Sequence, residues 1–154
     1  MIPRVHIVAL LLACACACAA RAQAGHYRVD PSATQIEFEV LHLGVLRAHG
    51  RFLQATGTVV YDAAGHGGRV EIDVDGTSIS TGWTLRDAFL RGEAMFDVDR
   101  HPVLRFRSTR LVFAGGRLAS VDGELTLRGV TRPLALAVTD IDCGDAARPR
   151  CVAT

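Results

Sequence analysis

The sequence predicts an all-β protein, an antiparallel meander that closes into a barrel and carries one short helix. Three observations predict this. Apolar and polar residues alternate along most of the chain after residue 24, turn residues separate the alternating segments, and one stretch breaks the alternation with helical spacing. Meanders of this kind protect their edges by closing, and a barrel of about eight strands is just wide enough to hold one small ligand.

The first 24 residues have the pattern of an export signal. Arg4 supplies the positive charge, a nearly uninterrupted apolar run extends from Ile7 to Ala20, and Ala22 to Ala24 offer a cleavage site of small residues. The run of about 14 residues is shorter than the roughly 20 that span a bilayer. We therefore expect a signal peptide at 1–24 and one domain at 25–154, with an uncleaved anchor or lipoprotein anchoring at Cys14 as minor alternatives.

The first strand is predicted at Ile36 to His42, where Ile36, Phe38, Val40 and His42 share one face. β character continues from Ala48 to Tyr61, with Gly50 and Gly57 as candidate bends. Asp62 to Gly68 form a turn, and the next strand carries Val70, Ile72 and Val74 on its apolar face.

The alternation breaks between Thr81 and Gly92. Leu85, Phe89 and Leu90 recur at helical spacing there, and Asp87 and Arg91 stand four residues apart as an ion pair would. We predict a short helix that Gly92 ends.

The last third returns to strands. Pro102 holds His101 extended, and Leu104 and Phe106 alternate with arginines. The remaining predicted elements are a hairpin turn at 114–117, a strand at 118–127, a turn at 129–133 and a strand marked by Leu134, Leu136 and Val138. The total is about seven strands.

Charge and cysteine content narrow the function classes. Without Arg4 and Arg21 the mature chain carries 15 arginines, no lysine and 16 carboxylates, with no basic block, so a nucleic-acid surface is disfavoured. Only Cys143 and Cys151 follow the signal segment, and in an oxidising compartment we expect a disulfide rather than a metal site.

Catalytic motifs are missing from the sequence. It has no nucleophile elbow, HExxH, P-loop or GxGxxG pattern, and no partner converges on Asp87 for acid–base work. His42 is either a hydrogen-bonded core histidine or a polar contact in a binding site. We expect a binding protein, not an enzyme, with no cofactor and no metal.

Four blocks of residues, in order along the mature chain, resemble the YceI-like proteins. They are Tyr27 to Pro31 with Ile36 to Gly44, Ser78 to Gly82 with Arg86 to Arg91, Phe96 to Val98 with His101, Pro102 and Phe106 to Thr109, and Gly123 to Pro133.

The resemblance implies a lipocalin-like antiparallel barrel in the periplasm, with an apolar tunnel that binds polyisoprenoids, isoprenoid quinones or other long-chain amphiphiles. Members run on past the last block with closing strands, so this barrel is expected to be incomplete at its C-terminus. The alternatives are a quinone-binding accessory to a membrane cytochrome and a truncated copy that binds nothing. A homodimer is a further expectation, and no nucleic acid or metal partner is expected.

With that resemblance, the inward apolar residues become candidates for the tunnel lining rather than for a filled core. They are Phe38, Val40, His42, Phe52, Ile72, Val74, Trp83, Leu85, Phe89, Phe96, Phe106, Leu125 and Leu127. Arg47, Arg86 and Arg91 are candidates for contacts with a phosphate or pyrophosphate head group, because guanidinium groups bind such anions in a bidentate way.

Overall fold

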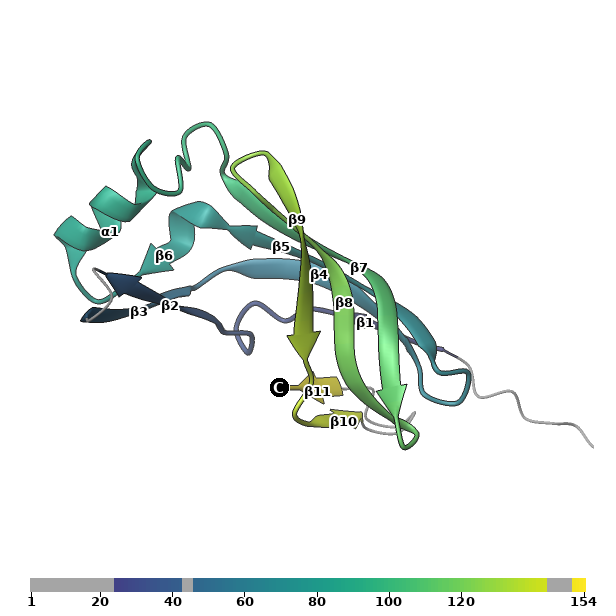
Figure 1. The fold of residues 1–154 in the computed structure, drawn as a ribbon. Coiled ribbons are helices and arrows are strands. Elements are labelled where there is room, and N and C mark those ends of the chain that lie inside the picture. Colours follow the sequence, from purple (N-terminus) through teal and green to yellow (C-terminus); the bar gives the residue numbers. More distant parts are fainter. Residues whose placement is uncertain (1–23, 43–45, 144–150) are drawn as a thin grey trace, which may run out of the picture.

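A computed structural model describes residues 24–42, 46–143 and 151–154, and the side chains of 40–42 and 46–48 lie outside that description. In this part of the chain, antiparallel strands are joined to one α-helix, which confirms the predicted all-β class (Figure 1). No helix among these residues is long and apolar enough to cross a bilayer.

The largest sheet has six antiparallel strands, and its alternating segments behave as predicted. In spatial order they are β1 (Gly25–Arg28), β4 (Ala55–Asp62), β5 (Gly67–Asp75), β7 (Val103–Ala114), β8 (Arg117–Leu127) and β9 (Val130–Ala137). Within the described residues the outer strands β1 and β9 each pair on one side, so the sheet is open there. Closure into a barrel stays a prediction.

Two smaller sheets complete the fold. One has three strands, β2 (Ile36–His42), β3 (Leu46–Phe52) and β6 (Ile79–Ser80). The other pairs β10 (Ile141–Cys143) with β11 (Cys151–Ala153). Figure 1 shows the three-stranded sheet together with helix α1 at one end of the elongated molecule, and β10 and β11 beside the far end of β9.

The β character predicted from Ala48 to Tyr61 is confirmed, but the bends predicted at Gly50 and Gly57 are wrong, because the chain changes sheets at Leu53 and Gln54. Phe52 ends β3 in the small sheet, and Ala55 begins β4 in the large one. The hydroxyl of Ser78, in the 3₁₀ helix η1 (Gly76–Ser78), accepts hydrogen bonds from the amides of Leu53 and Gln54, each at 3.1 Å. Ser78 therefore satisfies the amides that leave the β ladder at this corner.

The turn predicted at 129–133 is also wrong, since β9 already begins at Val130. Arg128 and Gly129, with φ of 51° and 73°, make the turn alone, as two-residue hairpin loops require. Val138 donates to the carbonyl of Ala119 at 2.8 Å, and the alternation of the ladder turns the nitrogen of Pro133 away from β8. An edge strand tolerates a proline in that position.

Helix α1 (Thr84–Arg91) confirms the predicted helix, although it starts three residues later than Thr81. Gly92 follows its last residue with an extended backbone and donates to the carbonyl of Phe89. Leu90 packs into a buried cluster with Phe52, Val74 and Ile79, which fixes the helix over the end of the sheets.

Candidate functional site

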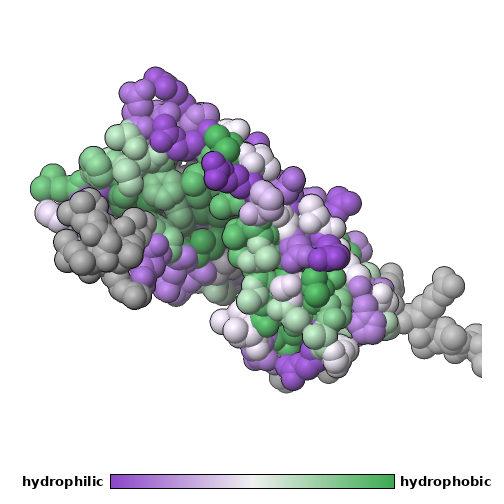
Figure 2. All heavy atoms as spheres, viewed as in Figure 1, coloured by the Kyte–Doolittle hydropathy of each residue, from purple (hydrophilic) through white to green (hydrophobic). Residues whose placement is uncertain are grey.

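One face of the six-stranded sheet is mostly apolar, although Arg132 on β9 lies on it as the cross-strand partner of Leu125. Directly paired residues share a face, so Ile72 on β5, Phe106 on β7 and Leu125 on β8 lie side by side. Two buried clusters follow this face, one beneath α1 and one beside β10, and Ile72 packs against both. Figure 2 shows hydrophobic atoms gathered in a hollow that runs between these two ends. We call this face the apolar face.

An aromatic cluster occupies the α1 end of the apolar face. The ring of Phe38 lies 5.4 Å from that of Phe52 and 5.9 Å from that of Phe96, and Phe52 and Phe96 meet edge to face at 5.6 Å. Phe52 is fully packed, whereas Phe38 and Phe96 are half-buried. The cluster therefore offers ring surface to a ligand without losing its own core contact.

Glycines allow these rings to lie flat on neighbouring strands. Gly50 is the cross-strand partner of Phe38, and a Cβ there would overlap its ring. Gly123 pairs with Ser108, and the ring of the diagonal neighbour Phe106 reaches over it, so that its Cζ would lie 2.6 Å from a Cβ at Gly123. A ring therefore fills the space above each glycine, and aromatic cover of this kind pins strand register.

The predicted tunnel-lining residues separate into three groups by exposure. Phe52, Val74 and Phe106 are packed core, at 4%, 6% and 5% exposure. The half-buried members, which a ligand can reach, are Phe38, Ile72, Phe96, Leu125 and Leu127. The side chains of Val40 and His42 lie outside the described residues.

Trp83, Leu85 and Phe89 form the third group. They are 57%, 73% and 61% exposed; Leu85 and Phe89 lie on the side of α1 opposite its buried residues, and Trp83 immediately precedes the helix. Helical spacing identified the apolar stripe, but the helix buries Asp87 and Leu90 instead.

Asp87 can be buried because its hydrogen-bond partners lie nearby in the sequence, on Thr81. Its carboxylate accepts hydrogen bonds from the backbone amide and the hydroxyl of Thr81, and these bonds hold the pKa of Asp87 below its usual value. Burial opposes this shift, and the charges of Arg91 and Arg86 add to it. The predicted pairing of Asp87 with Arg91 is thus an effect of charge rather than the main contact.

The head-group candidates Arg86 and Arg91 bind the protein's own oxygens. Arg86 donates to the hydroxyl and the carbonyl of Thr81, both at 2.8 Å. Arg91 donates to the carbonyls of Thr77 and Ile79 at 3.0 and 2.9 Å. Both side chains tie α1 to the segment before it. Arg47 lies outside the described side chains.

Sequence reasoning placed Leu134 and Leu136 on a strand but left the apolar residues of β9 out of the candidate tunnel lining. Val130, Leu134 and Leu136 pair with Leu127, Gly123 and Val121, so they extend the apolar face, and they are 54%, 37% and 38% exposed. Their alternation was visible, but the interpretation of 129–133 as a turn concealed where it begins.

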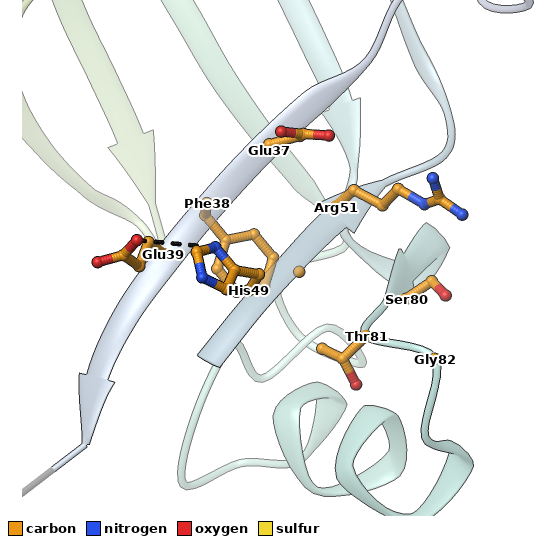
Figure 3. A pocket seen from close by; sticks show the side chains of 9 residues that line it. Glu37, Phe38, Glu39, His49, Arg51, Ser80, Thr81 and Gly82 are labelled. Atoms are coloured by element: carbon orange, nitrogen blue, oxygen red, sulfur yellow. Dashed lines mark ion pairs between the residues drawn. The ribbon is translucent and has the colours of Figure 1, made fainter. Parts of the chain in front are cut away.

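A polar hollow of ≈ 630 Å³ lies at the rim of the small sheet. Its lining residues are Glu37, Phe38, Glu39, His49, Gly50, Arg51, Ser80, Thr81 and Gly82. His49 lies 3.7 Å from the carboxylate of Glu39, its cross-strand partner, and Figure 3 shows the side chains of Glu39 and Arg51, which share one face of the hairpin, directed away from each other. The charges diverge, whereas acid–base catalysis needs groups that converge on one atom.

Two further features bear on the predicted chemistry. The described residues contain no group of three or more His, Cys, Asp or Glu side chains that could hold a metal ion. Cys143 and Cys151 form a disulfide that joins β10 to β11.

The fold and its apolar face can now be compared with known proteins. The sequence profile described as the YceI-like domain matches residues 27–151. The chain belongs to the YceI-like family. YceI-like relatives named UPF0312 protein include one from Pseudomonas savastanoi pv. phaseolicola, 32% identical over 136 residues (86% of this chain, 71% of the relative). One from Pseudomonas aeruginosa strain LESB58 is 33% identical over 142 residues (90% and 74%).

Solved structures show the same YceI-like fold. Burkholderia cenocepacia BcnA superimposes with a TM-score of 0.64 at 23% identity, covering 73% of this chain and 69% of its own. The Campylobacter jejuni YceI protein gives 0.59 at 21% identity, with 77% and 71% covered. At these identities the likeness concerns the fold alone.

Proposed function

We propose that this YceI-like protein binds and carries a long-chain apolar lipid along its apolar face, after export to the periplasm. The observation that supports the proposal is the row of half-buried and exposed apolar side chains from Phe38, beside α1, to Leu136 on β9, which Arg132 interrupts on that last strand. A soluble domain normally buries such a row, and large exposed apolar surfaces mark binding grooves.

The size of the hydrophobic effect favours a long ligand. Burying apolar area contributes about 25 cal/mol per Å², so a chain that covers about 400 Å² gains about 10 kcal/mol before association costs. No polar contact is needed for affinity on this scale. This explains how a binding face can exist without a recognisable motif.

A polyisoprenoid or an isoprenoid quinone is the ligand class that we propose, following the family resemblance. Repeated branched units suit a face built from rings and branched side chains, such as Phe96, Leu125 and Leu127. Arg86 and Arg91 already bind carbonyl oxygens, so a head-group role for them requires exchange of those contacts.

Native mass spectrometry of the protein purified from the periplasm, with organic extraction alongside, tests the proposal. We expect a co-purifying long-chain lipid, and a redox-active quinone among the extracts would favour the role beside a membrane cytochrome. An empty, folded protein that also fails to take up added polyisoprenol would contradict lipid binding.

A matched pair of substitutions locates the binding face. Leu134→Gln places an amide on the apolar face, whereas Val103→Gln does so on the opposite face of β7, at nearly equal exposure (37% and 36%). We expect the first to lower lipid occupancy roughly tenfold, because a buried unpaired amide costs ~1–3 kcal/mol, and the second to leave it unchanged. Equal occupancy in both variants would contradict this placement.

A further inference from the structure

Helix α1 carries exposed apolar side chains that are not part of the apolar face. Leu85 and Phe89 stand four residues apart, so they form one stripe on the helix, and Trp83 precedes the helix immediately. All three side chains are more than half exposed, while the opposite side of the helix buries Asp87 and Leu90. This inverts the usual arrangement, in which the apolar stripe of a surface helix faces the core. We call Trp83, Leu85 and Phe89 the α1 patch.

The inversion is held in place by specific contacts. Asp87 accepts two hydrogen bonds from Thr81, and Arg91 donates to two backbone carbonyls. Leu90 is 7% exposed in the buried cluster. Rotation of the helix to bury Leu85 and Phe89 would break all of these contacts. The patch is therefore a fixed feature of the fold.

The area of the α1 patch is too small for a stable protein partner. An aromatic side chain carries ~150–250 Å², so three side chains at this exposure present about 350 Å². A stable protein–protein interface needs ~800 Å² from each partner. A second copy of the chain docked on this patch alone would fall well below that figure.

The composition of the patch matches a bilayer interface instead. The guanidinium of Arg86 lies 5.8 Å from the centre of the Trp83 ring, so a cation stands beside the apolar stripe. Tryptophan is enriched at the boundary between headgroups and acyl chains, and arginine keeps its charge in water or on a phosphate while its stem is buried. Exposed Leu and Phe then enter the upper acyl region.

We propose that the α1 patch is a membrane-contact site, with Trp83, Leu85 and Phe89 inserted among lipid headgroups. Leu90 packs the helix onto the cluster that contains Phe52, with Phe38 and Phe96 against it, so contact would bring that end of the apolar face to the bilayer. The contact site rests on the exposure, area and composition of the patch and on the neighbouring Arg86. Its use for loading lipid rests on the proposed function.

The protein carries its own reporter for this site, because Trp83 is its single tryptophan. The test adds the mature protein to vesicles of phosphatidylcholine, with and without phosphatidylglycerol, and follows Trp83 emission, quenching by brominated acyl chains, and co-flotation. We expect a blue shift, quenching by bromines near the headgroups, and stronger flotation with phosphatidylglycerol, which adds attraction to Arg86.

Two double variants separate the patch from general stickiness. Leu85→Gln/Phe89→Gln keeps good helix formers at exposed positions, so the thermal melt should not change. Its partition into vesicles should fall roughly tenfold or more. Val103→Gln/Val152→Gln removes exposed apolar groups elsewhere, at 36% and 52% exposure, and should partition like the parent protein.

The outcomes distinguish this proposal from lipid binding. Unchanged partition of Leu85→Gln/Phe89→Gln, or flotation that salt abolishes without quenching of Trp83, would overturn the contact site. So would a dimer in sedimentation that this variant dissociates, since the patch would then bind a second copy. Loading with detergent-solubilised polyisoprenol is measured separately, and we expect this variant to load like the parent. Vesicle contact with no loading would refute the proposed function and leave the contact site standing.

Discussion

Gly50 lies opposite Phe38, and the space above its α-carbon is filled by the phenylalanine ring. The substitution Gly50→Ala adds a methyl group that would overlap this ring, with Cε1 at 2.8 Å. The ring cannot retreat freely, because it contacts the rings of Phe52 and Phe96. We therefore expect a loss of stability.

The magnitude follows from two opposed effects. Overpacking of a filled site costs about 1–3 kcal/mol, while replacing glycine stabilises by about 0.4–1 kcal/mol through the unfolded chain. The net loss is about 1–2 kcal/mol, which lowers Tm by about 4–8 °C for a domain of this size. Urea denaturation and a thermal melt measure it.

A double-mutant cycle identifies the cause. Phe38→Leu shortens the side chain that meets the new methyl, so the cost of Gly50→Ala should shrink by about 1 kcal/mol in that background. Gly67→Ala is the matched control, since the nearest atom to its new Cβ is the carbonyl oxygen of Gly65 at 3.9 Å. Additive costs at Gly50 and Phe38, or a Gly50→Ala protein as stable as the parent, would refute the packing argument.

Three further predictions concern other parts of the fold. Because Thr81 lowers the pKa of Asp87 in the folded state, ionised Asp87 stabilises the protein above its unfolded pKa, and this contribution is lost as pH falls through the folded pKa. The free energy of unfolding of Asp87→Asn, measured in urea titrations, should therefore fall less between pH 7 and pH 3 than that of the parent. An equal fall in both proteins would contradict the assignment. Reducing the disulfide, whose cysteines are 8 residues apart, should destabilise the β10–β11 pair by about 2–3 kcal/mol. Hydrogen exchange at the amide of Thr139, which donates to Thr154, measures this, and unchanged protection would count against it. Pro133→Thr restores an outward amide on the edge strand β9 and should increase self-association in analytical ultracentrifugation. Ala135→Thr, which adds no amide, should not, and equal association of the two variants would remove the role assigned to Pro133.

Local patterns predicted most of the strands. The alternation in β5, β7 and β8 is a property of neighbouring residues, and each alternating segment has one buried face. What failed was the position of the corners. The break at Leu53 depends on Ser78, which lies 25 residues further along the chain, and no local pattern carries that information.

The sequence predicted the apolar character of the candidate site, but it predicted only some of the residues that form it. Phe38 and Leu127 pack against the buried cluster beneath α1, as the alternation of their strands indicates, whereas Phe96 reaches the same cluster from the turn after α1. Helical periodicity finds the stripe of Leu85 and Phe89 but not the side that faces the core, because it treats Asp87 as a surface residue. Two hydrogen bonds from Thr81 reverse that assumption. The start of β9 at Val130 was assigned to a turn that needs only Arg128 and Gly129.

We expect the corner at Ser78 to separate two units that open independently. Its hydroxyl also donates to the carbonyl of Asp75 at 2.6 Å, so one side chain joins the ends of β3, β4 and β5. Within the small sheet, β3 and β6 share two residue pairs, whereas β7 and β8 of the large sheet share nine. Native-state hydrogen exchange should show β2 and β3 opening together at lower free energy than β7 and β8. The aromatic end of the apolar face would then be uncovered by a motion that leaves the rest of the fold intact.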